Sequence, residues 1–315
     1  MLRLFLLAAT TLLIALSRPG VYADTICGEP NISCPALVYQ GLTYPYQREP
    51  DSYLFIDGTT YPYAKITEHL LGDSEVALPG NRVIRVSDLL SKLQLEDHVG
   101  QRLYPIVGYG SNPAPAQLSR KFAKEISTGS VVMPVLKGSI EGYDVVWTPL
   151  FVRYGGMPAT LFPSEGTNTD IWVNWMTESE RARTDETENL SGSWYIRTAL
   201  PPNIATFRGP APTVIEVYLS CYGALDLGEG PIAVKAIPAR GRQFSAMSSP
   251  DILQAVLHRF SEYDTVVDLV FANASDPTTA VRNTHRLEDL RLFPGLQTNP
   301  REGCSTPSDD IPDGS

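Results

Sequence analysis

Residues 104–126, YPIVGYGSNPAPAQLSRKFAKEI, carry the sharpest local pattern in the chain. An apolar run at the start of this stretch ends in a glycine-containing turn at residues 108–112, GYGSN. Apolar residues then recur at every fourth position, namely Leu118, Phe122 and Ile126. The run predicts a strand, and the recurrence predicts an amphipathic helix over residues 117–126. We therefore expect a strand, a tight turn and a helix in immediate succession.

The turn has the chemistry of a small anion site. Gly108 and Gly110 permit backbone angles closed to other residues, and Ser111 and Asn112 can hydrogen-bond nearby main chain. Amides of a loop at the start of a helix point outward, where they can hold a carboxylate. The turn is neither a P-loop nor a nucleophile elbow, because Gly-Lys-Ser/Thr and Gly-x-Ser-x-Gly are missing. The alternative is a tight turn that binds nothing.

A second signal is the acidic string at residues 184–188, TDETE. Thr177 is a predicted N-cap, followed by acidic residues in the first turn, which indicates a helix that runs through Glu188. Asp185 and Glu188 are three residues apart, so they share one face of that helix. A functional carboxylate there would be buried and would accept a proton. The alternative is a solvated acidic surface.

The remaining patterns add strands and helices around these two signals. Strand-like runs surround the acidic helix on both sides: 131–136, 143–152, 158–162, 171–176, 213–222 and 231–237. Tyr53 to Ile56 reads as a strand that enters a turn at Asp57-Gly58. Helices are predicted over residues 86–95, capped by Ser87 or Asp88, and from Ser249 to Phe260, while residues 264–272 fit a helix or a strand. The mixture predicts an α+β fold.

The order of these elements resembles the gamma-glutamylcyclotransferase-like superfamily. The family's Tyr-Gly-Ser-Asn loop is matched by Tyr109, Gly110, Ser111 and Asn112, its Ala-Thr strand by Ala159-Thr160, and its Asp-x-x-Glu pair by Asp185 and Glu188. The resemblance covers roughly residues 104–200. It departs from the family pattern at Pro113, where Leu is usual, and at Thr184, which stands where the family's helix usually has Leu.

The resemblance implies a small mixed β-barrel or sheet with flanking helices. The loop at 109–112 would bind the α-carboxylate of the substrate, and Glu188 would be the acid–base residue, with Asp185 in a supporting role. The freed α-amine of a γ-glutamyl compound would attack its own γ-carbonyl, giving 5-oxoproline and an amine or peptide. Because the attack is intramolecular, orientation supplies much of the rate enhancement, and no metal or cofactor is required.

The first residues resemble a secretory signal rather than part of the fold. Arg3 precedes the apolar run at residues 4–16, and Val21-Tyr22-Ala23 fits a cleavage site. Residues 1–23 are therefore predicted to be a signal peptide of a secreted or periplasmic protein, an uncleaved anchor or a first helix being the alternatives. The net charge of −10 argues against partners with phosphate backbones or anionic lipid surfaces. The expected partner is a small-molecule or peptide substrate with a free carboxylate.

The four cysteines are an even set, which in an oxidising compartment favours disulfides. Three pairings are possible, and Cys27–Cys34 with Cys221–Cys304 is preferred because the first is local and the second ties the C-terminal tail to the core. A metal site is the competing interpretation. It is weak because there is no Cys-x-x-Cys motif and the four histidines are scattered.

These observations divide the 315 residues into five parts. They are a signal peptide (1–23), a Tyr/Pro-rich N-terminal segment packed on the core (24–100), a gamma-glutamylcyclotransferase-like domain (101–240), a C-terminal helical extension (241–298) and a flexible acidic tail (299–315). An exported enzyme that acts on γ-glutamyl or related amides is the preferred function. A secreted non-catalytic module that binds a carboxylate-bearing small molecule, an interaction protein that uses residues 24–100, and a serine hydrolase built on Ser111 and His258 are the alternatives.

Overall fold

The computed structural model describes residues 36–188, 190, 194–294 and 304. The predicted signal peptide, Cys27 and Cys34 lie outside the described residues, as does the tail from residue 299 apart from Cys304. Within the described part of the chain, no helix is both long enough and apolar enough to cross a membrane.

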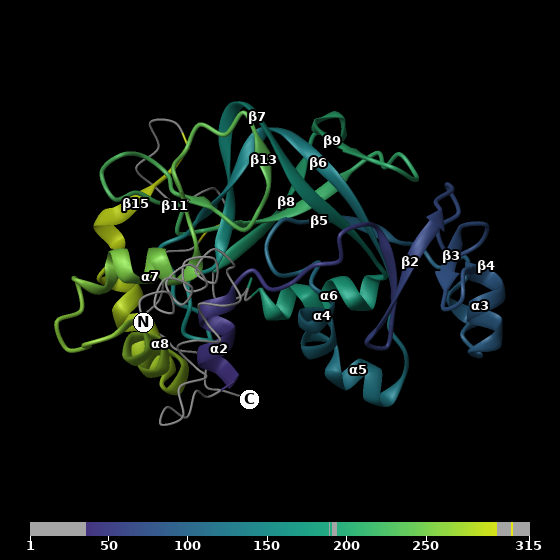
Figure 1. Ribbon diagram of the computed structural model, residues 1–315, viewed down its shortest axis with the longest axis horizontal. Coiled ribbons are helices and arrows are strands. Elements are labelled where there is room, and N and C mark those ends of the chain that lie inside the picture. Colours follow the sequence, from purple (N-terminus) through teal and green to yellow (C-terminus); the bar gives the residue numbers. More distant parts are fainter. Residues whose placement is uncertain (1–35, 189, 191–193, 295–303, 305–315) are drawn as a thin grey trace, which may run out of the picture.

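The core of the molecule is one large mixed sheet (Figure 1). In order of pairing, its main strands are β4 (Arg82–Arg85), β3 (Glu75–Leu78), β2 (Thr59–Lys65), β1 (Tyr53–Ile56), β6 (Val132–Trp147), β7 (Ala159–Met176), β5 (Tyr104–Gly108), β10 (Ile215–Ser220) and β8 (Tyr195–Leu200). Short strands join it or form a separate pair: β9 (Ala205–Phe207), β12 (Ala233–Val234), β13 (Ala239–Arg240), β14 (Ala246–Met247), and the pair β11 (Ala224–Leu225) with β15 (Arg291–Leu292). The β10–β5 and β12–β14 pairs are parallel, and the other pairs are antiparallel.

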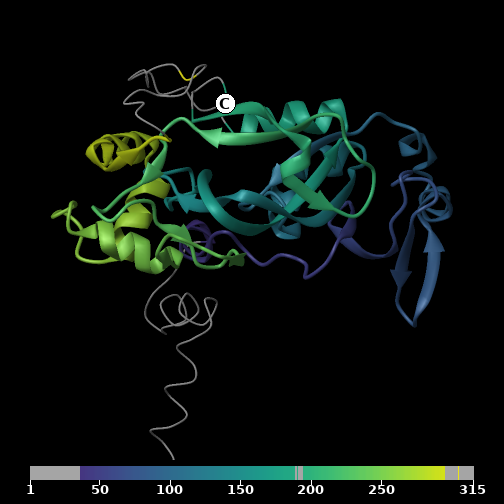
Figure 2. The same ribbon diagram turned by 90° about the horizontal axis from the view of Figure 1, so that it is seen from above.

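Helices flank the sheet, so the predicted α+β class is confirmed. They are α2 (Ala36–Thr43), α3 (Val86–Lys92), α4 (Pro115–Lys121), α5 (Ala123–Thr128), α6 (Glu178–Thr187), α7 (Ser249–Leu257), α8 (Val266–Ser275) and α9 (Pro277–His285), with 3₁₀ turns at Glu96–His98, Pro202–Ile204 and Glu288–Leu290. In both ribbon views the lobe with β3, β4 and α3 projects at one end of the molecule, and α7 and α8 lie at the other (Figures 1 and 2). Helices α4, α5 and α6 lie together below the sheet in Figure 1.

Two long strands replace the four predicted between residues 131 and 176. β6 and β7 pair along almost their whole length, from Val135 opposite Asn174 to Trp147 opposite Ala159. Residues 137–142 of β6 are mostly polar or glycine, so the sequence pattern predicts a break between two strands there. This segment continues the ladder because backbone groups make the hydrogen bonds, and one register shift near Gly142 absorbs the irregularity.

The helix predicted over residues 117–126 is two helices, α4 and α5. They meet at Phe122, whose φ of −106° lies outside the helical range. Helix α4 begins earlier than predicted because Pro115 suits a first turn, where its missing N–H costs nothing.

Helix termini agree with the predictions in some places and differ in others. Helix α6 begins as predicted, with Thr177 and Glu180 in a full capping box. The N-cap of α3 is Arg85, without a side-chain cap, so the prediction of Ser87 or Asp88 is wrong. Residues 266–275 form a separate helix, α8, which the capping box of Thr265 starts.

The Tyr53–Ile56 strand is confirmed, and its turn is a two-residue hairpin loop. Ile56 pairs with Thr59, and both Asp57 (φ 46°) and Gly58 (φ 89°) adopt positive φ. Because β1 also pairs with β6, this N-terminal hairpin is continuous with the main sheet.

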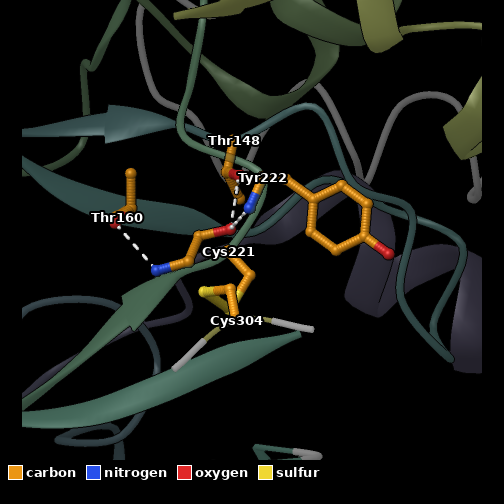
Figure 3. The surroundings of a disulfide bond; sticks show 6 residues. Thr148, Thr160, Cys221, Tyr222 and Cys304 are labelled. Carbon is orange, nitrogen blue, oxygen red and sulfur yellow. Dashed lines mark hydrogen bonds between the residues drawn. A yellow bond between two sulfur atoms is a disulfide. The ribbon is translucent and has the colours of Figure 1, made fainter. Parts of the chain in front are cut away.

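The Cys221–Cys304 disulfide is present, with 5.6 Å between the Cα atoms (Figure 3). Cys221 directly follows β10, where the amide of Ser220 donates to Thr160 Oγ1 and the amide of Tyr222 donates to Ser220 Oγ. The bond therefore ties the C-terminal region to the end of a sheet strand, as the preferred pairing predicts.

Candidate active site

A pocket of about 220 Å³ lies where the turn after β5 meets the end of α6. The sequence-predicted residues Tyr109, Gly110, Ser111, Asn112 and Glu188 all line it. The other lining residues are Tyr44, Val107, Gln117, Lys121, Val152, Arg153, Tyr154, Pro158, Ala159, Thr187, Trp194, Tyr195 and Tyr218. The two stretches that stand apart in the sequence thus share one cavity.

The glycines of the turn are needed for space rather than for unusual backbone angles. Neither Gly108 nor Gly110 has a positive φ, so the turn does not use the left-handed backbone angles that glycine permits. A Cβ at position 108 would lie 2.6 Å from Asn174 Oδ1, and one at position 110 would collide with Tyr44 Oη. Side chains from β7 and from the segment after α2 therefore pack directly on the turn.

The turn is held from beneath by two buried side chains. Asn174, on β7, donates from Nδ2 to the carbonyl of Asn112 over 3.2 Å. Tyr53, on β1, donates from its hydroxyl to the carbonyl of Pro113. Tyr44 and Tyr53 both belong to the Tyr/Pro-rich segment, so part of that segment builds the wall of the pocket.

Asn112, Lys121 and Glu188 form a closed ring of hydrogen bonds. Asn112 Nδ2 donates to Glu188 Oε1 over 3.1 Å, and Lys121 Nζ donates both to Asn112 Oδ1 and to Glu188 Oε1, each over 2.8 Å. The Lys121 side chain is 3% exposed and that of Glu188 18%. No described residue donates to Glu188 Oε2, which is therefore available to a ligand.

Loop amides next to this ring are also available. Among the described residues, none accepts a hydrogen bond from the N–H of Gly110, Ser111 or Asn112. The N–H of Ala114 is used within the turn, where it donates to the carbonyl of Ser111 over 2.9 Å, and Pro113 has none. Up to three amides can thus serve a bound anion.

Helix α6 places Glu188 at its C-cap position, just after the last helical residue, Thr187. Asp185 does not line the pocket. Its carboxylate accepts from Arg197 Nε over 3.0 Å and from the Tyr218 hydroxyl over 2.7 Å, which joins the end of α6 to β8 and β10. Asp185 therefore acts on the site by fixing the helix and the Tyr218 ring.

Tyrosines make most of the remaining wall. The hydroxyl of Tyr195 donates to the carbonyl of Ala159 over 2.9 Å, and the hydroxyl of Tyr109 donates to the carbonyl of Tyr218 over 2.6 Å. Burial, and then the negative charge of Glu188, raises the pKa of Tyr44. Burial likewise raises the pKa values of Tyr195 and Tyr218. The wall is therefore neutral, and the ionic chemistry of the pocket belongs to Lys121, Glu188 and the exposed Arg153.

Four residues of the pocket are not among those predicted from the sequence: Lys121, Tyr44, Tyr195 and Tyr218. Lys121 had a signal, because it stands beside Phe122 on the apolar side of a predicted helix, where a lysine is buried only if it has a partner. Tyr44 belongs to the string TYPY at residues 43–46, where tyrosines are most simply packing residues with a polar tip.

Two competing interpretations find no support in the described residues. No group of three or more His, Cys, Asp or Glu side chains is placed there to hold a metal ion. His258 Nδ1 contacts the carbonyl of its own-helix neighbour Ala255, and His258 is not among the residues that line the pocket with Ser111. The serine hydrolase interpretation therefore lacks its base.

No family model matches the chain, and no curated protein matches it. Among solved structures it is similar to a gamma-glutamyl cyclotransferase, with 11% identity, a TM-score of 0.30, and coverage of 64% of this chain and 95% of that one. It is also similar to an uncharacterized protein from Homo sapiens, with 12% identity, a TM-score of 0.29, and coverage of 64% and 96%. The link is a distant one at the level of fold, and neither structure bears on what this pocket does.

Proposed function

We propose that the pocket is the active site of an enzyme that releases 5-oxoproline from γ-glutamyl compounds, with Glu188 as the general base. One observation carries the proposal: the Glu188 carboxylate meets the turn of Asn112 in one cavity and keeps Oε2 free of described donors. A carboxylate placed in this way can take a proton from a bound ammonium.

The step requires only groups that the pocket supplies. The α-carboxylate of the substrate binds the amides of the turn, and Glu188 removes one proton from the α-ammonium. The freed amine attacks the γ-carbonyl carbon, so that a C–N bond forms within the substrate and the original amide C–N bond breaks. The proton held by Glu188 goes to the leaving amine, and the ring nitrogen then gives up a second proton, which the released amine takes up to become an ammonium. Holding the amine against its own carbonyl supplies much of the rate enhancement.

The size of the pocket favours a small substrate. A volume of about 220 Å³ is below the usual range for drug-sized ligands, roughly 300–1,000 Å³. A single γ-glutamyl group with a short acceptor suits such a space better than a long peptide.

The test uses the purified chain with a γ-glutamyl dipeptide, and 5-oxoproline is measured by mass spectrometry. Glu188→Gln is expected to reduce its formation by about 100- to 10,000-fold, because an acid–base group contributes that much. Glu186→Gln is the matched control. Glu186 is on the same helix, but it is exposed and paired with Arg183, so its replacement should leave turnover unchanged. An absence of product from a broad panel of γ-glutamyl amides would refute the proposal.

A non-catalytic module that binds a carboxylate-bearing small molecule is the second candidate. It is favoured by the ion pair between Lys121 and Glu188, because the ammonium neutralises the carboxylate that would act as base. Such a protein would show a rise in Tm with γ-glutamyl ligands and no product.

We also propose that the chain is exported, on the basis of the signal-like pattern in residues 1–23. If so, the mature protein recovered from outside the cytoplasm should begin at Asp24. An intact Met1 in the exported fraction would contradict cleavage.

A further inference from the structure

We propose that Lys121 is the cation that anchors the carboxylate of the ligand, so that the pocket selects compounds with an ammonium and a carboxylate on the same carbon. This inference rests on the proposed function. It adds to the loop amides a charged side chain that determines which ligands bind.

Lys121 has an unused donor in a buried position. An ammonium group carries three N–H donors, and Lys121 Nζ uses two of them, on Asn112 Oδ1 and Glu188 Oε1. No other described residue accepts a hydrogen bond from it, although its side chain is almost fully buried. Because Lys121 also lines the pocket, the third donor is available to a ligand.

Two features hold Lys121 in place before any ligand binds. Its side chain is held by Asn112 and Glu188, and its main-chain carbonyl accepts from Arg183 Nε over 3.2 Å. Since Arg183 is on α6, both ends of the residue are tied to the helix that carries Glu188. A cation fixed in this way loses little conformational freedom when it binds an anion. No described residue accepts a hydrogen bond from Arg153, the exposed cation at the pocket.

The charges of the pocket match an α-amino acid. The Lys121 ammonium and the Glu188 carboxylate are in direct contact, with 2.8 Å between Nζ and Oε1. In a ligand with both groups on one carbon, the carboxylate can approach Lys121 while the ammonium approaches Glu188. Four alternating charges then neutralise one another. An amine without a carboxylate leaves Lys121 without a third partner.

The turn increases the need for such a cation. Pro113 and Pro115 lack an N–H, and the N–H of Ala114 is used internally, so the region offers fewer amide donors than a turn without prolines. A charged donor compensates, because hydrogen bonds to ions are stronger than those between neutral groups.

The experiment compares two probes by calorimetry. One is L-γ-glutamyl-L-alanine, and the other is the same compound with the α-carboxylate of its glutamyl group converted to a carboxamide. The wild-type protein is expected to bind the first about 10- to 100-fold more tightly. In Lys121→Met this preference should collapse, through weaker binding of the carboxylate probe alone. Lys124→Met, a change at an exposed lysine three residues away, should retain the preference.

The outcomes separate this inference from the proposed function. A preference that the wild type shows and Lys121→Met loses, without any 5-oxoproline, supports the role of Lys121 and refutes the catalytic proposal. Turnover by a protein that binds both probes equally refutes the role of Lys121 and supports catalysis. Equal weakening of both probes in Lys121→Met indicates a purely structural lysine and overturns the inference. If Lys121→Met fails to fold, Lys121→Gln is measured in its place, and equal binding of both probes by the wild type overturns the inference without any variant.

Discussion

Helix α6 has a glutamate near each end, and the two carboxylates obtain their hydrogen-bond donors from different parts of the molecule. At the N-terminal end Glu180 is 5% exposed, and its Oε2 accepts from the amide and the hydroxyl of Thr177, three residues earlier. At the C-terminal end Glu188 accepts from Asn112 and Lys121, which lie on other elements. Glu180 is held mainly by the first turn of its own helix, with a contribution from the backbone of Val132 on β6, whereas Glu188 is held by side chains from the turn after β5 and from α4.

This difference separates a structural carboxylate from a candidate functional one. Glu180 completes a capping box, which satisfies amides that would otherwise lack partners at the start of the helix. Glu188 ends the helix, faces a cavity and keeps one oxygen free of described donors. Burial alone would have selected Glu180, which is the more buried of the two. The source of the partners is the better guide to function.

The largest expected effect that tests this comparison is on turnover. Glu188→Gln should reduce 5-oxoproline formation by about 100- to 10,000-fold. Glu180→Gln should leave it near the wild-type rate, because Glu180 does not line the pocket. The two rates are compared on samples with matching circular dichroism spectra. Equal losses of turnover would show that the two ends of the helix do not differ in the way we describe.

The next effect is a pH dependence of stability that belongs to the N-terminal end alone. Burial raises the pKa of Glu180 from its ordinary value of 4.5 to about 7. The folded protein therefore binds this proton more tightly than the unfolded chain does. The resulting stabilisation is complete below about pH 4.5 and is lost as the pH rises through 7, with a total effect of about 3 kcal/mol.

Urea denaturation from pH 5 to pH 8 measures this effect. In Glu180→Gln, the fall in the free energy of unfolding over that range should be smaller by most of this amount. Glu178→Gln is the control in the same turn, because the hydrogen bond to Arg181 lowers the pKa of Glu178. Its titration therefore lies below the range tested. Identical pH profiles for wild type and Glu180→Gln would contradict the raised pKa.

The smallest effect concerns the threonines at the two ends. Thr177→Ala removes the N-cap and should lower the free energy of unfolding by about 1 kcal/mol. Thr187→Ala removes only a hydroxyl that donates to the carbonyl of Thr184 within the helix. Because alanine has the higher helix propensity, we expect little change there. Thermal unfolding of both variants tests the prediction, and a larger loss for Thr187→Ala would reverse it.

Local features were predictable from the sequence because their causes lie within a few residues. The start of α6 at Thr177, the Asp57-Gly58 hairpin turn and the strand from Tyr104 follow from capping, turn preference and hydrophobic pattern. The break at Phe122 and the fusion of apolar runs into β6 and β7 were not predictable. They depend on how the helices and the sheet pack, which periodicity does not encode.

The same division applies to the site. The sequence itself contains the carboxylates at both ends of α6 and the glycine-containing turn after β5. Only the tertiary structure brings Lys121 to Glu188, which is 67 residues later in the chain. It also places the Tyr44 hydroxyl where a Cβ at position 110 would lie, so that position requires a glycine. Capping and turn formation are interactions between close neighbours in the chain. The assembly of a pocket from distant segments depends on long-range packing, so no short stretch of sequence specifies it.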